Sequence, residues 1–313
     1  MTLNRKDFLG LYNVSFDEIN EILITAEAMK EIFNRSVKKI PTLRGKTIVN
    51  LFFEPSTRTR SSFDLAAKRL SADVMSIAKS SSSVVKGETL YDTARTLEVM
   101  GADVVVVRHS VPGAAEFLSK NLQASVLNAG DGAHAHPTQA LLDMYTIKEK
   151  VGYIEGLKVV IVGDIMHSRV ARSNIWGLTK LGAEVRVVGP ATLIPRDIKK
   201  MNVRVFTNLD KALEGADVVN ILRIQLERQS KGLFPSIREY RQFYGFNQER
   251  FDKLSDDVVI MHPGPMNRGL EIDSSVADGA NSVITQQVTN GVAIRMALLY
   301  LLVGRNTDNE YIN

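Results

Sequence analysis

The stretch FFEPSTRTR, residues 52–60, places hydroxyl side chains and arginines directly after an apolar run. A proline ends the predicted strand, and Ser56 or Thr57 can cap the helix that begins there. A helix N-terminus presents unpaired N–H groups and a positive dipole end, and both attract an anion. Capping explains one hydroxyl, but not Arg58 and Thr59 as well. We therefore predict a phosphate cradle, distinct from a Walker loop because the sequence has no GxxxxGK[ST] motif.

Two further candidate segments follow later apolar runs. Arg108 ends the run ADVVVVR at the carboxyl end of a predicted strand, where an ordinary terminal charge is an equally good interpretation. In HAHPTQ, His136 stands before a proline at a helix start, and both His136 and Gln139 can bond a carbonyl oxygen of one ligand. His134 and His136 are two residues apart with no visible third ligand, so a metal site is disfavoured.

Two arginines in the second half suit a ligand with two carboxylates. Arg169 lies in the first turn of the helix after VVIVGD, and Arg223 follows the run ADVVNIL. Bidentate arginine–carboxylate pairs would hold such a ligand, although salt bridges to local acids explain either arginine alone equally well. The turn HPGP (262–265) follows another strand and can present its backbone to a ligand. Only Gly163 stands where the dinucleotide motif GxGxxG needs three glycines, which disfavours NAD binding.

The elements that must position these residues alternate between apolar, β-branched runs and segments of helical periodicity. The predicted strands are 46–53, 73–78, 102–108 and 124–129, then 157–164, 183–190, 203–208, 216–222 and 257–262. Such alternation is typical of right-handed βαβ crossovers. We therefore predict an α/β fold of two domains, each with a mainly parallel sheet flanked by helices. The chain is expected to change domain near residues 130–152, and the apolar last helix, 285–304, to return to the first domain.

Composition excludes several classes of function. The 313 residues include no cysteine, so a disulfide framework, a thiolate nucleophile and a cysteine-based zinc site are ruled out. The net charge of +4 is spread along the chain without a basic stripe, which argues against nucleic-acid binding. The longest clean apolar run, 296–303, is too short to span a bilayer. Because the N-terminus also lacks the apolar core of a signal peptide, a cytoplasmic protein is expected.

Six motifs, in this order, resemble the transcarbamylase family and, within it, the aspartate carbamoyltransferases. They are PSTRTR, KGET, HPTQ, HSRVARS, the RIQ of LRIQLER, and HPGP, and they extend over nearly the whole chain. The resemblance implies a carbamoyl phosphate-binding domain over residues 1–135, joined again by helix 286–305, and an L-aspartate-binding domain over residues 136–285. Two crossing helices join the domains of this family.

The resemblance also assigns the site residues. Carbamoyl phosphate would be bound by Ser56, Thr57, Arg58, Thr59, Arg108, His136 and Gln139, of which Arg58, Thr59, Arg108 and His136 would be catalytic. L-Aspartate would be bound by Lys86, Arg169, Arg223, Gln225, Gly264 and Pro265. The loop SSSSVVKGETLYDT (80–93) alone is best interpreted as a solvated surface loop. In this family, however, it comes from a neighbouring subunit, so Ser82 and Lys86 imply a homotrimer with shared active sites.

The implied reaction transfers the carbamoyl group of carbamoyl phosphate to L-aspartate, an early step of de novo pyrimidine (UMP) biosynthesis. It needs no cofactor and no metal. Two departures from the best-known members are HPGP in place of HPLP, and Val85 where some members carry a second lysine. The rival hypotheses are an ornithine-type enzyme, an acylated ornithine or another amine as acceptor, a dinucleotide-dependent oxidoreductase, and a non-catalytic structural subunit. The sequence leaves open whether regulatory chains or a dihydroorotase join the assembly.

Overall fold

The structure is a computed structural model that describes residues 3–78, 88–224 and 236–304. The chain divides into two units, unit 1 with Met1–Leu141 and Thr289–Asn313, and unit 2 with Leu142–Val288. Both boundaries fall inside helices, α5 (Pro137–Val151) and α11 (Ile284–Leu299), so each of these helices contributes residues to both units.

The sheet of unit 1 has four parallel strands in the order β2-β1-β3-β4. Its strands are β1 (Thr47–Phe52), β2 (Asp73–Ala78), β3 (Val104–His109) and β4 (Ser125–Asp131). β1, β3 and β4 are buried along nearly their whole length, as expected of parallel strands covered on both faces. The four strands predicted from apolar runs in the first half are confirmed.

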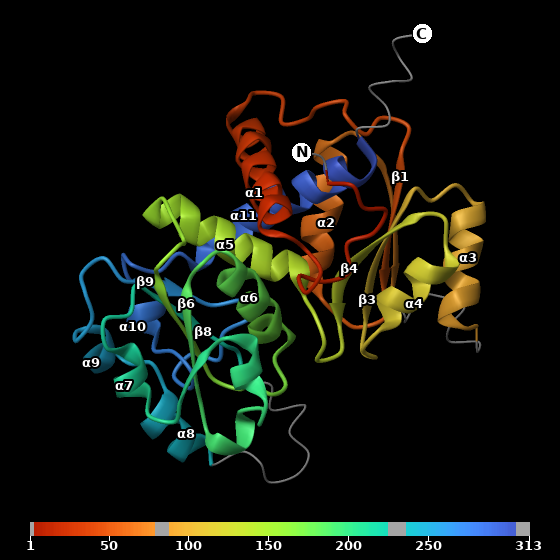
Figure 1. The fold of residues 1–313 in the computed structure, drawn as a ribbon. Helices are drawn as coiled ribbons and strands as arrows, with labels where there is room; N and C mark the ends of the chain where they lie inside the picture. The colour runs from red at the N-terminus through yellow and green to blue at the C-terminus, as the bar shows by residue number, and fades with distance from the viewer. Residues whose placement is uncertain (1–2, 79–87, 225–235, 305–313) are drawn as a thin grey trace. The chain divides into compact units, whose positions relative to one another are not determined.

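Helices cover both faces of this sheet. They are α1 (Phe16–Glu31), α2 (Thr57–Arg69), α3 (Leu90–Val99) and α4 (Ala114–Asn121), with the 3₁₀ turn η1 (Ile32–Asn34) after α1. Figure 1 shows α3 and α4 on the side of the sheet opposite to α1 and α2. Leu97 of α3 and Leu118 of α4 pack with Val105 and Val126 of the sheet in one buried apolar cluster. The opposite face is therefore left to α2, whose first turn carries the predicted phosphate cradle.

The sheet of unit 2 has five parallel strands in the order β7-β6-β5-β8-β9. They are β5 (Lys158–Val162), β6 (Glu184–Val188), β7 (Arg204–Phe206), β8 (Val218–Ile221) and β9 (Val259–Met261). All five lie inside the runs predicted as strands, so the α/β class with two parallel sheets is confirmed. The strand order places β5 and β8 next to each other although 55 residues separate Val162 from Val218.

The helices of unit 2 include several short ones. They are α6 (Arg169–Lys180), α7 (Leu209–Leu213), α8 (Ile237–Tyr244), α9 (Gln248–Phe251) and α10 (Ser274–Ala277), with the 3₁₀ turns η4 (Ala191–Leu193) and η5 (Ile198–Met201). Leu209 of α7 and Val276 of α10 pack with Val160, Val219 and Ile260 in a buried cluster on one face of the sheet. Both faces of the central strands are covered, because β8 is buried throughout and β5 is buried at every residue after Lys158.

The last helix is longer than the apolar run seen in the sequence. α11 continues into a π-helical segment, η7 (Tyr300–Gly304), and Ile284–Gly304 is long and apolar enough to cross a membrane by length and composition. However, 72% of its most apolar window is buried inside the protein. The core helix of a soluble protein passes the same test, so this helix is no support for a membrane span.

Candidate active site

The predicted phosphate cradle lies at the start of α2, directly after β1. Ser56 is the N-cap residue, and its side chain accepts a hydrogen bond from the Thr59 backbone N–H at 3.4 Å. Thr59 is buried on the first turn, whereas Thr57 and Arg58 are exposed there. α2 has no acidic residue in its first turn, so the positive end of its dipole is not offset by a carboxylate of its own.

Arg108 is the next-to-last residue of β3 and takes part in an ion pair that the sequence analysis missed. Its Nη2 donates to Glu54 Oε1 at 2.8 Å, and its Nη1 donates to the Ala129 carbonyl oxygen at 3.2 Å. The Phe53 backbone N–H donates to the Arg108 carbonyl at 2.8 Å, which ties the end of β3 to the turn before α2. The position of Glu54, an acid between an apolar strand and two arginines, is the signal that could have revealed this pair.

His136 and Gln139 follow β4 at the start of α5. Both are buried, and the His136 carbonyl accepts from the Gln139 backbone N–H at 3.1 Å. His134 instead bonds Asp131 through Nδ1 at 3.0 Å, and half of its side chain is exposed. The two histidines therefore have different surroundings, and His136 is the one that lies in the protein interior.

The predicted carbamoyl phosphate residues thus converge on one edge of the unit 1 sheet. Ser56–Thr59 follow β1, Arg108 lies in the last two residues of β3, and His136 and Gln139 follow β4. β1, β3 and β4 are neighbours in the sheet, so their carboxyl ends lie side by side. This is the edge at which open α/β sheets bind ligands.

The predicted aspartate residues occupy the corresponding edge of unit 2. Arg169 is the first residue of α6 and is buried, and Ser168 caps this helix by accepting from the Ala171 backbone N–H at 3.1 Å. Arg223 follows β8, and Gly264 and Pro265 follow β9. β5, which precedes α6, lies beside β8, and β8 lies beside β9. The three segments therefore leave the sheet at adjacent carboxyl ends.

The HPGP turn is organised by a buried histidine. The Gly264 backbone N–H donates to His262 Nδ1 at 2.8 Å, so the ring proton is on Nε2, which lies 3.3 Å from Glu271 Oε1. The side chains of His262 and Glu271 are fully buried. Glu271 Oε1 also accepts from the Asn267 backbone N–H at 2.5 Å, and the Gly264–Pro265 peptide bond is cis. The two side chains thus fix the path of the turn that carries two predicted site residues.

Some predicted site residues lie outside the described part of the chain. They are Ser82, Lys86 and Gln225. Their assignments stay predictions. Within residues 3–78, 88–224 and 236–304, no three histidine, cysteine, aspartate or glutamate side chains come together in an arrangement that could hold a metal ion.

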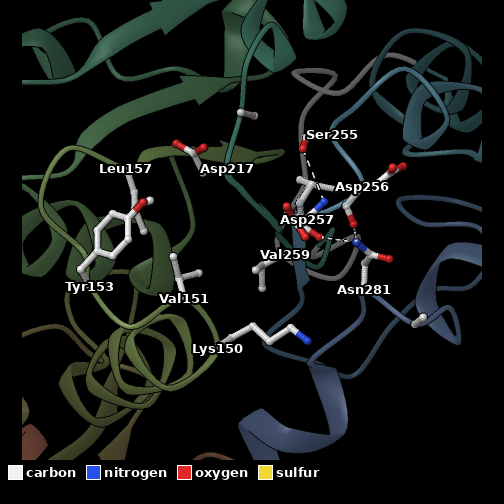
Figure 2. Close-up of a pocket in the computed structure, with 13 residues that line it drawn as sticks. Lys150, Val151, Tyr153, Leu157, Asp217, Ser255, Asp256, Asp257, Val259 and Asn281 are labelled. Atoms are coloured by element: carbon white, nitrogen blue, oxygen red, sulfur yellow. Dashed lines mark hydrogen bonds between the residues drawn. The ribbon is translucent and has the colours of Figure 1, made fainter.

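A cavity of about 690 Å³ lies elsewhere in unit 2. Figure 2 shows Lys150, Asp217, Asp257 and Asn281 among the side chains around it. Asp217 directly precedes β8 and Asp257 lies two residues before the start of β9, so this cavity is at the amino ends of the strands. It lies at the sheet edge opposite Arg169, Arg223, Gly264 and Pro265, the predicted aspartate residues that the structure describes, and none of these four lines it.

Comparison with known proteins identifies the family. A family model described as "Aspartate/ornithine carbamoyltransferase, carbamoyl-P binding domain" matches residues 6–149, and "Aspartate/ornithine carbamoyltransferase, Asp/Orn binding domain" matches residues 155–302. The aspartate carbamoyltransferase catalytic subunit of Halothermothrix orenii is 81% identical over 99% of both chains, and that of Moorella thermoacetica is 63% identical over 97% of this chain and 99% of its own.

Solved structures agree with these matches. The catalytic subunit of M. jannaschii aspartate transcarbamoylase superposes with a TM-score of 0.85 at 36% identity, covering 98% of this chain and 99% of the other. Trypanosoma cruzi aspartate transcarbamoylase in complex with carbamoyl phosphate and aspartate gives a TM-score of 0.87 at 29% identity, covering 95% and 96%. The chain therefore belongs to the aspartate/ornithine carbamoyltransferase family.

Proposed function

We propose that this protein transfers the carbamoyl group of carbamoyl phosphate to the amino group of L-aspartate, giving N-carbamoyl-L-aspartate and phosphate. The observation that carries the proposal is the 81% identity, over essentially the full length, to an aspartate carbamoyltransferase catalytic subunit. The reaction is an early step of de novo pyrimidine (UMP) biosynthesis. Because its phosphorylated substrate is an intracellular metabolite, a cytoplasmic location is part of the proposal.

Carbamoyl phosphate is assigned to unit 1. The first turn of α2, with Ser56, Thr57, Arg58 and Thr59, takes the phosphate, since N–H groups, hydroxyls and a guanidinium all donate to its oxygens. The carbamoyl end is assigned to Arg108 at the carboxyl end of β3 and to His136 and Gln139 after β4. Arg108, His136 and Thr59 stabilise the oxyanion that develops on the carbamoyl oxygen, and Arg58 offsets the charge that grows on the departing phosphate.

L-Aspartate is assigned to unit 2. Arg169 and Arg223 pair with its two carboxylates, Gln225 assists, and the backbone at Gly264 and Pro265 supports the ligand. The uncharged α-amino group attacks the carbamoyl carbon, a tetrahedral intermediate forms, and the C–O bond to phosphate breaks. The amine proton passes to the departing phosphate, so no covalent enzyme nucleophile is required. A dinucleotide-dependent oxidoreductase has no support, since the family models match residues 6–149 and 155–302 as carbamoyltransferase domains.

Ser82 and Lys86 are assigned to the active site of a neighbouring subunit, which makes the active assembly a homotrimer. Two inactive variants, Lys86→Ala and His136→Ala, test this assignment. Mixed after mild dissociation, they should regain part of the wild-type activity, because some sites then receive both native residues. No recovery, or an active monomer of 34.7 kDa in analytical ultracentrifugation, would contradict it.

The direct test of function follows phosphate release from carbamoyl phosphate with three acceptors: L-aspartate, L-ornithine and an acylated ornithine. Release with L-aspartate alone, and N-carbamoyl-L-aspartate as the product, is expected. Release with either ornithine compound would mean that Arg169 and Arg223 bind something other than two carboxylates. No release with any acceptor would favour a non-catalytic subunit.

A further inference from the structure

Arg295 is a buried cation that the reaction described above does not use. It lies on α11 in the part that belongs to unit 1, and only 3% of it is exposed. Its Nη1 donates to Ser62 Oγ at 3.0 Å and to the Gly291 carbonyl at 2.8 Å, and its Nη2 lies 3.4 Å from Thr138 Oγ1. It is therefore held by two hydroxyls and one carbonyl.

Those hydroxyls belong to the segments that carry the proposed carbamoyl phosphate residues. Ser62 is on α2, the helix whose first turn forms the phosphate cradle. Thr138 is on α5, between His136 and Gln139. Arg295 thus connects the N-terminal parts of α2 and α5. The Phe63 ring lies 5.0 Å from its guanidinium.

The charge of Arg295 has only neutral partners among the described residues. No carboxylate there forms an ion pair with it, and its buried Nε has no acceptor. Two other buried arginines differ in this respect, because Arg108 pairs with Glu54 and Arg186 pairs with Glu184, each at 2.8 Å. An ionised group in the protein interior is costly unless it is paired. Ligand-free unit 1 therefore carries an uncompensated positive charge next to its anion site.

The pKa of Arg295 reflects this situation. Burial, followed by the nearby positive charge of Arg108, lowers the pKa of Arg295 to about 9. The guanidinium is still protonated at neutral pH. An anion bound by Arg108 would reduce the repulsion between the two guanidinium groups, and so would favour the charged form of both.

We propose that Arg295 is a positioning residue for carbamoyl phosphate: it holds the starts of α2 and α5 together, and its buried charge is compensated by the phosphate dianion when substrate binds. This inference rests on the proposed function. The interior screens charges weakly, so a cation that does not touch the ligand still contributes to its affinity. The same charge destabilises the ligand-free protein, and the two effects can be measured separately.

The test uses the full chain with Arg295→Gln, which keeps hydrogen-bond donors but loses the charge, and Arg295→Lys, which keeps the charge. Calorimetry measures the Kd of inorganic phosphate and of carbamoyl phosphate, and thermal unfolding measures Tm with and without phosphate. We expect the Gln variant to bind both anions about 10-fold more weakly, and the Lys variant to stay within about 3-fold of wild type. The KM for L-aspartate should change by less than about twofold in both variants.

The ligand-free Tm distinguishes this proposal from a structural role. Without ligand, we expect the Tm of the Gln variant to be equal to or higher than that of the wild type. Saturating phosphate should raise the Tm of the Gln variant by less than it raises the wild-type Tm. Arg186→Gln is the matched control, since it removes a buried arginine of unit 2 that bonds Glu184 and the carbonyl oxygens of Ala212 and Glu214. The Arg186→Gln variant should have a lower Tm than the wild type and the same affinity for phosphate.

Three outcomes would overturn the proposal. They are equal anion affinities in the Gln, Lys and wild-type proteins, a Gln variant that is less stable than wild type without ligand, and a Gln variant that does not fold. Failure of the wild-type protein to bind carbamoyl phosphate would instead contradict the proposed function.

Discussion

Unit 1 and unit 2 each have a buried charged residue that bonds the segments of the predicted site, and these two charges have opposite signs. In unit 1 the residue is Arg295, which comes from α11 and bonds two hydroxyls and a carbonyl. In unit 2 it is Asp143, which comes from α5 and accepts hydrogen bonds from three side-chain amides. A cation behind an anion site adds to the attraction for substrate. The Asp143 carboxylate in unit 2 has a different role, since it fixes the backbone segments that carry Arg169 and Arg223.

Asp143 connects the three segments that carry the predicted aspartate residues. Its Oδ2 accepts from Asn174 of α6 at 2.7 Å and from Asn220 of β8 at 3.3 Å, and its Oδ1 accepts from Gln287 of α11 at 2.7 Å. Gln287 in turn accepts from the His262 backbone N–H at 3.0 Å, directly before the HPGP turn. All of these residues belong to unit 2, so one carboxylate connects the elements that carry Arg169, Arg223 and the HPGP turn.

The difference shows two ways of building a binding site. The phosphate residues of unit 1 are consecutive on one helix start, so capping and the helix dipole organise them locally. The residues of unit 2 come from three elements that are far apart in the sequence, and long-range side-chain hydrogen bonds organise them. We therefore expect unit 2 to be the more sensitive of the two to changes in its interior.

The largest expected effect is a loss of activity with L-aspartate that leaves phosphate binding by unit 1 unchanged. Arg169→Gln should lower kcat/KM for L-aspartate by about 1,000-fold, because a charged bidentate contact is lost. The Kd of phosphate, measured by calorimetry, should stay within about twofold since Ser56–Thr59 belong to unit 1. Arg172→Gln, one turn further along α6, is the control and should change neither value by more than about threefold. An Arg169→Gln variant that loses phosphate affinity would break the proposed division between units.

The next largest effect tests the support of unit 2. Asp143→Ala should lower the free energy of unfolding by about 3 kcal/mol, because three amide donors lose their acceptor in the interior. It should also raise the KM for L-aspartate more than that for carbamoyl phosphate. Urea unfolding and steady-state kinetics measure both changes.

Asp64→Ala is the matched control in unit 1. Asp64 accepts from Asn50 and Ser76, both at 2.7 Å, but its side chain is partly exposed, so its removal should cost only about 1 kcal/mol. Equal losses of stability in the two variants would mean that the two units do not differ in sensitivity.

A smaller effect compares two helix caps within unit 1. Ser56→Ala and Ser15→Ala should each cost about 1 kcal/mol of stability, because each removes an N-cap hydrogen bond. Only Ser56→Ala should weaken phosphate binding, since Ser15 caps α1 in a capping box with Glu18. Thermal unfolding and phosphate calorimetry on both variants measure this contrast, and equal phosphate affinities would count against the cradle at Ser56.

The smallest effect is an acid sensitivity of unit 1. Arg5 Nη2 bonds Glu18 Oε2 at 2.8 Å, and this contact lowers the pKa of the Glu18 carboxyl to about 2. Because the folded-state pKa lies below the usual 4.5, the pair stabilises the protein above pH 4.5, and this stability is lost as pH falls toward 2. The loss should be under about 1 kcal/mol for this partly exposed pair. Urea midpoints at pH 6 and pH 3 should differ less in Glu18→Gln than in wild type, and an unchanged difference would exclude this pair as a cause.

Much of the fold could be predicted because its signals are local. Parallel strands such as β3 and β8 are apolar along their whole length, so Val104–His109 and Val218–Ile221 stand out in the sequence. The residues of the predicted phosphate cradle are equally easy to find in the sequence, because they are consecutive and one of them caps α2. Glu54 was missed although it lies in the same stretch, since its partner Arg108 is 54 residues away.

What the sequence determined by itself was therefore the class of the fold, the positions of its strands, and the residue types available at the carboxyl end of each. Only the tertiary structure decided which of those ends are neighbours, through the strand orders β2-β1-β3-β4 and β7-β6-β5-β8-β9. It also decided that Arg295 and Asp143 are buried and which groups they bond. A single charged residue in a helix has no sequence signature for its partner, because the partner's identity depends on which distant segments pack against that helix.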